Sequence, residues 1–388
     1  MNCRNLKLSA FVFIFITLLS GCAKKTMSFQ TVGAPNTTNK TAQRIYKILP
    51  QYAALAKEPW LPIHSEQMPL KLGNHNLAVS QIRERLIALG DMQNLPVHNT
   101  KEFDSNVQYG VMQFQWRNGL KSNGIVNQAT LNALNVTPAE RYRELITSMN
   151  EWGKLPEDEG ARYIHVNIPD FKLHLIDRGN AVLSMNVITG RSARPTPILY
   201  SKVQTIVFNP QWNVPNTILK EDIIPGMQKN QNYLNEHGGL KIYKNWDKNA
   251  PEVDPVSINW QTANLSNFNY RLTAPAGEQN PLGRVKFIFE NSEDVYMHDT
   301  PQKELFSDMK RAYSSGCIRL EHPFQLVEYF YSDNSDLSPE LTNQYLSSGQ
   351  TKYIQLKTPM PIYVTYITAS VDEQGHAHFR EDIYRKHD

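Results

Sequence analysis

The stretch "VYMHDTPQKELFSDMKRAYSSGCIRLEHP", residues 295–323, brings a histidine and a cysteine into one short segment. His298 closes a run with strand propensity, and the Asp-Thr-Pro that follows it ends a strand. Cys317 lies nineteen residues later, directly after an irregular Ser-Ser-Gly turn. A thiol beside an imidazole can act as a nucleophile with its base. The segment therefore holds a candidate catalytic pair, and the alternative is a structural histidine with an inert, buried cysteine.

The neighbours of Cys317 favour the catalytic interpretation. A helix is expected to begin near Pro323, so Cys317 is expected at a loop-to-helix junction, where free backbone N–H groups favour negative charge. Such a place, with an imidazole nearby, can lower a thiol pKa from ~8.5 into a range of roughly 3.5–7.5. Gly316 leaves room for a carbonyl to approach the loop amides, so an oxyanion hole could form there. Arg319 can bind a substrate carboxylate through two parallel hydrogen bonds.

The N-terminus predicts export and a lipid anchor. Arg4 and Lys7 precede an apolar run, residues 8–19, that is too short to span a bilayer, so residues 1–21 are expected to be a signal peptide. Its end, "LSGC", resembles a bacterial lipobox, in which Cys22 becomes the lipidated first residue. The Ala-Lys that follows resembles the pattern of lipoproteins sent to the outer membrane. We therefore expect a periplasmic, lipid-anchored protein, with an ordinary buried segment as the alternative.

Three cysteines are present, and export leaves one of them chemically free. Cys3 would leave with the signal peptide and Cys22 would carry the lipid. Cys317 then has no partner for a disulfide in an oxidising compartment, where free thiols are prone to oxidation. A lone thiol there is either buried and inert or kept for its chemistry.

Composition sets broad limits. The chain has 388 residues, 40% of them hydrophobic, and a net charge of +3. This length supports two or three domains after the signal peptide. No basic block is interleaved with aromatic residues, so nucleic acid is not an expected partner.

The first half of the chain has helical periodicity after a Thr/Asn-rich tether (residues 22–40). A helical segment is expected over residues 41–76, a small helical unit over 77–137 and a linker helix over 138–159. The stretch "VMQFQWRNGLKSNGIVNQATLNAL", residues 111–134, resembles the three-helix peptidoglycan-binding domain, although Asn123 stands where that family prefers Asp. The resemblance implies that glycan is a partner, and a generic helical bundle is the alternative.

From residue 160 to residue 370 the period changes to two, which predicts a mostly β domain. The strands are expected in "RYIHVNIP", "FKLHLI" and "AVLSMNVI", then at residues 202–208, 285–289, 295–297, 353–356 and 362–367. The Asn- and Lys-rich stretch 216–270 interrupts this pattern and is expected to be a lid or a disordered insertion. Residues 371–388 are expected to form a polar tail.

The motifs "HDTP" and "SSGCIR" resemble those of the L,D-transpeptidase catalytic domain, in particular the larger murein enzymes of Gram-negative bacteria. The resemblance covers residues 162–323 through "VITGRSARPTP", "FNPQWNVP" and "LGRVKFIFEN". It implies a multidomain α+β protein whose catalytic domain is a β-sandwich and whose insertion 216–270 is a capping subdomain.

The same resemblance implies a reaction on peptidoglycan without metal or cofactor. Cys317 would attack the L-centre carbonyl of diaminopimelate in a tetrapeptide stem and expel the terminal D-Ala. The thioester would pass to the amine of a second stem, giving a 3→3 cross-link, with His298 moving the protons. Carbapenems would acylate the same cysteine. The resemblance further assigns the oxyanion to amides near Ser315, Gly316 and Cys317, and the substrate groove to Tyr296, Trp212 and Arg319.

Other readings of the sequence remain open. The enzyme could be an L,D-carboxypeptidase or another cysteine peptidase or transferase of the wall, and the acceptor could be a stem peptide, a lipoprotein lysine or water. A non-catalytic lipoprotein that anchors the wall is an alternative of another class. Ser307 and Lys310 have the S-x-x-K spacing of penicillin-binding proteins, but no accompanying element follows. The "HAH" at residues 376–378 is expected to be a solvated pair rather than a metal site, because no acidic partner is evident in the tail.

Overall fold

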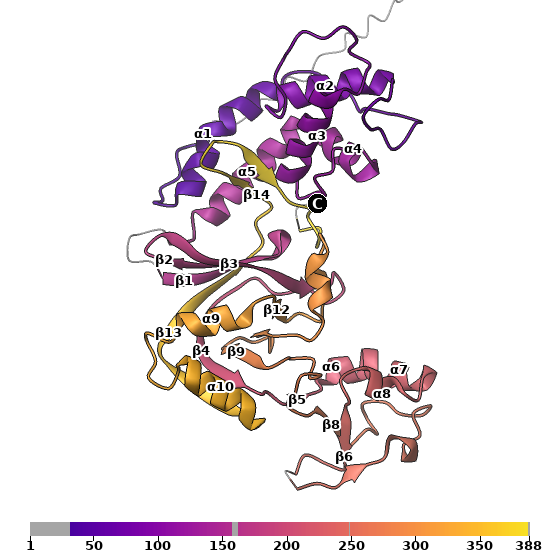
Figure 1. The fold of residues 1–388 in the computed structure, drawn as a ribbon, viewed down its shortest axis with the longest axis vertical. Coiled ribbons are helices and arrows are strands. Elements are labelled where there is room, and N and C mark those ends of the chain that lie inside the picture. The colour runs from indigo at the N-terminus through magenta and orange to yellow at the C-terminus, as the bar shows by residue number, and fades with distance from the viewer. Residues whose placement is uncertain (1–31, 157–161, 248, 387–388) are drawn as a thin grey trace, which may run out of the picture. The chain divides into compact units, whose positions relative to one another are not determined.

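The computed structural model describes residues 32–156, 162–247 and 249–386 (Figure 1). The expected signal peptide, its lipidation site Cys22 and residues 22–31 of the expected tether lie outside the described residues. None of the helices in the described ranges is long and apolar enough to cross a bilayer.

Helices precede the β-rich part of the chain, and their starts follow from side-chain caps. The helices are α1 (Lys40–Leu55), α2 (Leu77–Ala88), α3 (Ser105–Arg117), α4 (Gln128–Asn135) and α5 (Pro138–Trp152). Each begins after an Asn, Asp or Thr whose side chain accepts a hydrogen bond from the first turn. Gly90 and Gly119 follow α2 and α3 with positive φ angles, as expected for the residue after a helix end. Helices therefore lie in each expected part of this region, but the helical segment expected over residues 41–76 is wrong beyond Leu55, because residues 56–76 contain no helix.

One buried cluster holds α2, α3 and α4 together. It contains the apolar faces expected from the spacing of these helices, which are Val79, Ile82, Leu86, Val107, Val111, Phe114, Leu131 and Leu134. Burying side chains of this size contributes about 1.5–3 kcal/mol each relative to exposure. The unit expected over residues 77–137 thus has a core of its own.

Within the described residues, nine strands form a sheet that closes on itself. The strands are β1 (Arg162–Asn167), β2 (Lys172–Asp177), β3 (Asn180–Gly190), β4 (Leu199–Phe208), β9 (Val285–Phe289), β10 (Met297–His298), β11 (Ala312–Ser314), β12 (Ile318–Leu320) and β13 (Lys352–Thr365). Their order is β11-β3-β12-β10-β9-β4-β13-β1-β2, and β2 pairs again with β3. The inward side chains of these strands form a single buried cluster, to which α9 (Pro323–Tyr329) adds Leu326 and Val327. The predicted mostly β domain is confirmed.

Two differences from the expected elements affect the site. Strand β12 begins directly after Cys317, so the cysteine lies at a loop-to-strand junction, and the expected loop-to-helix junction is wrong. The cause is that three residues, Ile318–Leu320, are too few to show a strand period in the sequence. The second difference is that β13 is one strand with an irregular register between Gln355 and Met360 where two strands were expected. The remaining short helices of this domain are η1 (Ile168–Asp170), η4 (Lys303–Ser307) and α10 (Pro339–Ser348).

The insertion is a folded subdomain and is not disordered. Its sheet has the order β5-β8-β6-β7, and the sheet is accompanied by short helices (Figure 1). The elements are β5 (Trp212–Asn213), α6 (Asn216–Ile218), the π-helical turn η2 (Leu219–Ile223), α7 (Ile224–Lys229), α8 (Tyr233–Glu236), β6 (Lys241–Tyr243), β7 (Glu252–Val253), η3 (Pro255–Ser257) and β8 (Arg271–Ala274). A separate buried cluster that includes Met227, Trp260 and Phe268 stabilises it. Because β5 pairs with β8, the folded insertion extends beyond the expected 216–270 at both ends.

The expected polar tail is instead folded onto the protein. Strand β14 (Ala369–Val371) pairs with β15 (Ala377–Phe379), and Phe379 is buried with its ring centroid 6.0 Å from that of Tyr52 in α1. His378 is buried as well, with its Nε2 2.9 Å from Asp372, whereas His376 is exposed, so the expectation of a solvated histidine pair is wrong for His378. The strands have three residues each, and such short runs carry too little alternation to reveal a hairpin.

Candidate active site

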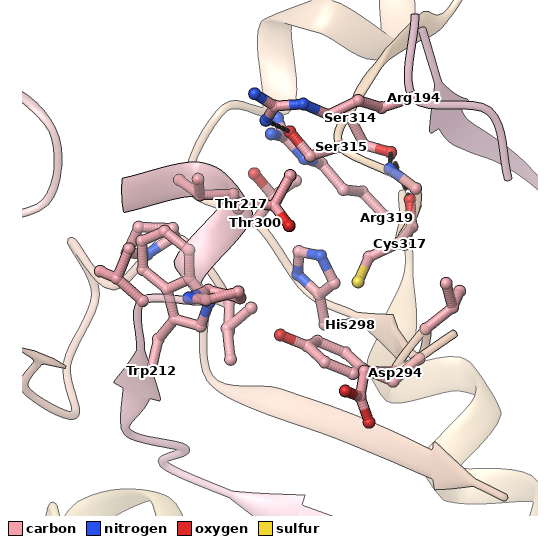
Figure 2. A pocket seen from close by; sticks show the side chains of 18 of the residues that line it. Arg194, Trp212, Thr217, Asp294, His298, Thr300, Ser314, Ser315, Cys317 and Arg319 are labelled. Carbon is pink, nitrogen blue, oxygen red and sulfur yellow. Dashed lines mark hydrogen bonds between the residues drawn. The ribbon is translucent and has the colours of Figure 1, made fainter. Parts of the chain in front are cut away.

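Cys317 and His298 lie side by side because their strands are neighbours. Strand β10 pairs in parallel with β12, and the amide of Ile318 donates to the carbonyl of Tyr296 at 3.0 Å. In this register Cys317, which precedes β12, lies beside Tyr296, which precedes β10, and the side chains of Cys317 and His298 point to the same face of the sheet. Figure 2 shows the sulfur of Cys317 facing the His298 ring, with Trp212 on the opposite side of the pocket. The structure therefore brings together the pair that the sequence predicted.

A backbone carbonyl sets the tautomer of His298. Its Nδ1 lies 2.5 Å from the carbonyl oxygen of Asp299. A carbonyl only accepts, so Nδ1 carries the hydrogen, and the lone pair of the neutral ring is left on Nε2. The Asp299 carboxylate is engaged elsewhere, because it accepts from the amide of Arg284 at 2.9 Å and pairs with Lys303 at 2.8 Å. The group that orients His298 is thus a backbone carbonyl and not the adjacent Asp299 carboxylate.

Both members of the pair are electrically neutral in the resting site. Burial, together with the positive charge of Arg319, lowers the pKa of His298 to about 3. Burial raises the pKa of the Cys317 thiol, although hydrogen bonds from Tyr296 and the charge of Lys286 act in the opposite direction. The expected lowering of the thiol pKa is therefore wrong, since no helix begins at Cys317 and the sulfur is largely removed from water. The thiol proton must leave during the attack rather than before it.

The Ser-Ser-Gly turn is held in shape by its own hydrogen bonds. Gly316 has a φ of +113°, which side-chain-bearing residues rarely adopt. Its amide donates to Ser314 Oγ at 3.1 Å, and Ser314 Oγ donates to the carbonyl of Cys317 at 2.5 Å. Gly316 was expected to supply an oxyanion donor, but its N–H is already satisfied here. In the described part of the chain, the amides of Ser315 and Cys317 have no hydrogen-bond partner.

Two arginines that the sequence analysis missed connect the turn to the insertion. The Ser315 hydroxyl accepts from Arg194 at 2.9 Å and from Arg191 at 3.1 Å. Arg194 also pairs with Asp222 at 2.6 Å and with Glu221, both in η2 of the insertion. The arginines lie in the segment "VITGRSARPTP". Two arginines in a loop bounded by glycine and proline are visible in the sequence, but the sequence does not show which groups they bind. Arg191 also contacts Asp222, with its Nη2 3.4 Å away, so the loop before Cys317 is bonded to the capping subdomain through both guanidinium groups.

The same loop makes a second contact, which fixes the backbone of the Ser-Ser-Gly turn. Thr196 Oγ1 accepts from the amide of Gly190 and donates to the carbonyl of Gly316, both at 2.8 Å. A Cβ at Gly190 would lie 2.2 Å from the carbonyl oxygen of Arg194, so only glycine permits this close approach. The β3–β4 loop thus acts as the support on which the Ser-Ser-Gly turn rests.

The predicted residues line one open cavity of about 1600 Å³. They are Cys317, His298, Ser315, Gly316, Arg319, Tyr296 and Trp212. Arg319 Nη1 donates to Gln302 at 2.7 Å, and its buried Nε has no hydrogen-bond partner in the structure. Ser307 lies outside this lining, where its hydroxyl donates to the carbonyl of Glu304 at 2.7 Å. The described ranges contain no cluster of ligands that could hold a metal ion.

Comparisons with known proteins agree with this geometry. The family model for the L,D-transpeptidase catalytic domain matches residues 161–354, and that for a "Putative peptidoglycan binding domain" matches residues 75–134. A Haemophilus influenzae protein named "Putative L,D-transpeptidase" is 36% identical over 221 residues. That match covers 57% of this chain and 44% of the relative, so the chain spans less than half the length of that protein.

Solved structures of L,D-transpeptidases are also similar, at low sequence identity. One from Mycobacterium smegmatis is 13% identical, covering 52% of this chain and 57% of its own, with a TM-score of 0.24. One from Stackebrandtia nassauensis is 13% identical, covering 78% and 97%, with a TM-score of 0.28. Mycobacterium tuberculosis L,D-transpeptidase 3, solved with a faropenem-derived adduct, is 12% identical, covering 53% and 60%, with a TM-score of 0.25. TM-scores of this size do not by themselves establish a common arrangement of the chains.

Proposed function

This chain belongs to the L,D-transpeptidase family, and on that premise we propose that it forms 3→3 cross-links between peptidoglycan stem peptides through a Cys317 thioester. The observation that carries the proposal is the thiol facing a carbonyl-oriented imidazole in an open cavity of the matching domain. The donor would be a tetrapeptide stem and the acceptor a diaminopimelate amine of a second stem.

In the first half-reaction, Cys317 Sγ attacks the L-centre carbonyl carbon of diaminopimelate. The thiol proton passes to His298 Nε2 as the carbon–sulfur bond forms, because the resting pair is neutral. The amides of Ser315 and Cys317, which have no hydrogen-bond partner among the described residues, would donate to the oxyanion. The amide bond to D-Ala then breaks, and the imidazolium returns the proton to the departing amine. A thioester remains on Cys317.

In the second half-reaction, the acceptor amine attacks the thioester carbonyl. His298 takes a proton from the amine, and the sulfur leaves and recovers a proton from the imidazolium. Water in place of the amine would give a tripeptide, which is the carboxypeptidase outcome. Trp212 and Tyr296 line the cavity beside the nucleophile and are proposed to hold the peptide.

The decisive experiment is product analysis with purified protein. Mass spectrometry of muropeptides after incubation with a tetrapeptide substrate should show 3→3 dimers and free D-Ala. Cys317→Ala should fold with an unchanged melting temperature and form no dimers, whereas Ser307→Ala should behave as the natural protein does. Tripeptide without dimers would identify a carboxypeptidase. Unchanged wall binding and no thiol reactivity would instead leave a non-catalytic anchor.

We expect carbapenems to acylate Cys317, because a β-lactam carbonyl would meet the same nucleophile and oxyanion donors as the donor peptide. Intact mass after incubation with a carbapenem should rise by one adduct, and peptide mapping should place it on Cys317. The Cys317→Ala protein should remain unmodified. An adduct on Ser307, or none, would contradict this expectation.

We also propose that the mature protein is anchored in the periplasm by a lipid on Cys22, in the outer membrane, and that residues 75–134 contact the glycan. The "LSGC" sequence and the match to a peptidoglycan-binding domain support these assignments. The mass of the mature N-terminus after membrane fractionation would test the anchor, and loss of the lipid in Cys22→Ala would confirm its position.

A further inference from the structure

Three neighbouring strands place a cation on each side of the His298 imidazole. His298 is paired in register with Lys286 of β9 on one side and with Arg319 of β12 on the other. Residues directly opposite each other on adjacent strands present their side chains to the same face of a sheet. All three line the cavity that contains Cys317. The row Lys286–His298–Arg319 therefore crosses the wall of the cavity next to the nucleophile.

Among the residues that the structure describes, neither cation of this row has an acidic partner at ion-pair distance. The contact of Arg319 is with the neutral Gln302, and its buried Nε has no partner at all. Lys286 Nζ lies 3.6 Å from the centroid of the Tyr296 ring, in a cation–π contact. The carboxylate of Asp294 lines the same cavity and attracts Lys286, but it lies beyond ion-pair distance. Lys303 differs, because it is paired with Asp299 at 2.8 Å.

Unpaired charges in a partly desolvated cavity are costly for a folded protein. Burial lowers the pKa of both Lys286 and Arg319, because removal from water disfavours their charged forms. Such charges are retained where a ligand supplies the opposite charge. Two positions on either side of the catalytic base fit a ligand with two anionic groups around the reacting bond.

We propose that Lys286 is a second carboxylate-binding residue of the donor site. The donor peptide is held by two of its carboxylates, one on Lys286 and one on Arg319, with the attacked carbonyl between them at Cys317. This inference rests on the proposed function, because a wall tetrapeptide is the donor that offers several carboxylates. The inference goes further than the proposed function, because it requires that the enzyme recognises a second carboxylate of the donor peptide besides the one bound by Arg319.

Two-point binding has a consequence for the base. Burial is the main reason that the pKa of His298 is low, and the positive charges of Arg319 and Lys286 lower that pKa further. Carboxylates that pair with these cations offset this second contribution only.

The test compares donors and lysine variants in one assay. Release of the terminal residue is measured with the free tetrapeptide and with two donors singly amidated, at the terminal carboxylate or at the side-chain carboxylate of diaminopimelate. The donor amidated at its terminal carboxylate releases D-alaninamide in place of D-Ala, and mass spectrometry quantifies both products. The proteins are the natural enzyme, Lys286→Met, Lys286→Arg and the control Lys202→Met, which removes an exposed lysine of neighbouring β4. We expect Lys286→Met to raise KM for the free donor about ten- to a hundredfold, the size of a charged hydrogen bond.

The decisive readout is the pattern across donors. The donor amidated at the carboxylate that Lys286 binds should already show the raised KM with the natural enzyme. Lys286→Met should not raise the KM of that donor further. Lys286→Arg should recover most of the affinity, and Lys202→Met should leave all values unchanged. Equal losses for all three donors with Lys286→Met, or no loss for any, would overturn the inference.

Failure of the proposed function would look different. A carboxypeptidase would release D-Ala without forming dimers, and a non-catalytic anchor would release no D-Ala from any donor. Calorimetric binding of the same donors to Cys317→Ala and to Cys317→Ala with Lys286→Met still tests the carboxylate contact. A Kd for the free donor that is unaffected by the lysine change, or no binding at all, would overturn the inference by this second route.

Discussion

The positive φ of Gly316 connects one backbone angle to the position of the nucleophile. A Cβ at Gly316 would meet no atom closer than 3.8 Å, so there is space for a side chain. The φ of +113° is what disfavours any residue other than glycine at this position. Residues with a side chain strain such a backbone by about 1–3 kcal/mol. The turn would relax away from this angle and carry the amides of Ser315 and Cys317 with it.

We therefore expect Gly316→Ala to lose at least tenfold in D-Ala release and about 1–3 kcal/mol in the free energy of unfolding. Urea unfolding and a steady-state assay measure the two effects. Gly153→Ala is a matched control, because Gly153 ends α5 with an ordinary φ of −63°. Full activity in Gly316→Ala would show that the turn tolerates another backbone angle.

Sequence reasoning located the reacting side chains but misjudged their electrostatics. Residue type and spacing were enough to find Cys317, His298 and Arg319, which strand pairing then brings together. The thiol pKa depends on burial and on whether a helix begins next to it, and neither can be read from a few neighbouring letters. Lys286 was missed because its role depends on which strand lies beside β10, a long-range property of the sheet.

At the scale of elements, the helices were the most predictable and the short strands the least. Apolar residues at helical spacing predict the unit that contains α2, α3 and α4, whereas the linker helix α5 begins at Pro138 as expected and ends at Trp152, before the expected residue 159. Strands β11 and β12 have three residues each and pair with β3, which lies far away in the sequence. Only the tertiary fold supplies that partner, so no local pattern announces these two strands. Strands β14 and β15 are equally short and pair with each other in a local hairpin, whose alternation is too brief to be recognised.

Arg194 makes the shorter of the two arginine contacts between the insertion and the Ser-Ser-Gly turn, and replacing its side chain would remove that contact. The Arg194 side chain is 10% exposed and bonds Ser315 on one side and Glu221 and Asp222 on the other. We expect Arg194→Ala to lower kcat for D-Ala release about tenfold, because a misplaced turn moves the oxyanion donors. Asp222→Asn should give a smaller loss in the same direction.

A control and a coupled variant separate this effect from general loosening of the insertion. Lys241 pairs with Glu252 inside the insertion, and both side chains are about half exposed, so Lys241→Ala should change neither stability nor kcat. In a Ser315→Ala background, Asp222→Asn should have little further effect, since the hydroxyl that the arginines hold is gone. Additive losses in the double variant would show that the insertion acts by another route.

At the scale of the whole molecule, the helices and the β domain meet around buried imidazoles. His165 of β1 lies with its ring centroid 5.3 Å from that of Trp152 in α5, and its Nε2 lies 2.8 Å from Thr365 Oγ1. Burial lowers the pKa of His165 to about 3 and lowers that of nearby His174 as well. Trp152 also donates to the carbonyl of Ala369 at 2.9 Å, so the contact includes the C-terminal hairpin that the sequence analysis expected to be a tail.

These imidazoles predict how stability depends on pH. Above pH ~6.5 His165 is neutral in both the folded and the unfolded chain, and it contributes no pH dependence. Between pH ~6.5 and about 3 only the unfolded chain binds the proton, so the free energy of unfolding falls by about 1.4 kcal/mol per pH unit for this histidine. Urea unfolding of the natural protein at pH 7 and pH 5 should show this loss, and His165→Gln should reduce it by about 2 kcal/mol relative to the natural protein. His322→Gln, which removes an exposed histidine, should leave the dependence unchanged. An identical slope in His165→Gln would mean that β1 and α5 separate before the histidine titrates, and that the two parts of the molecule unfold independently.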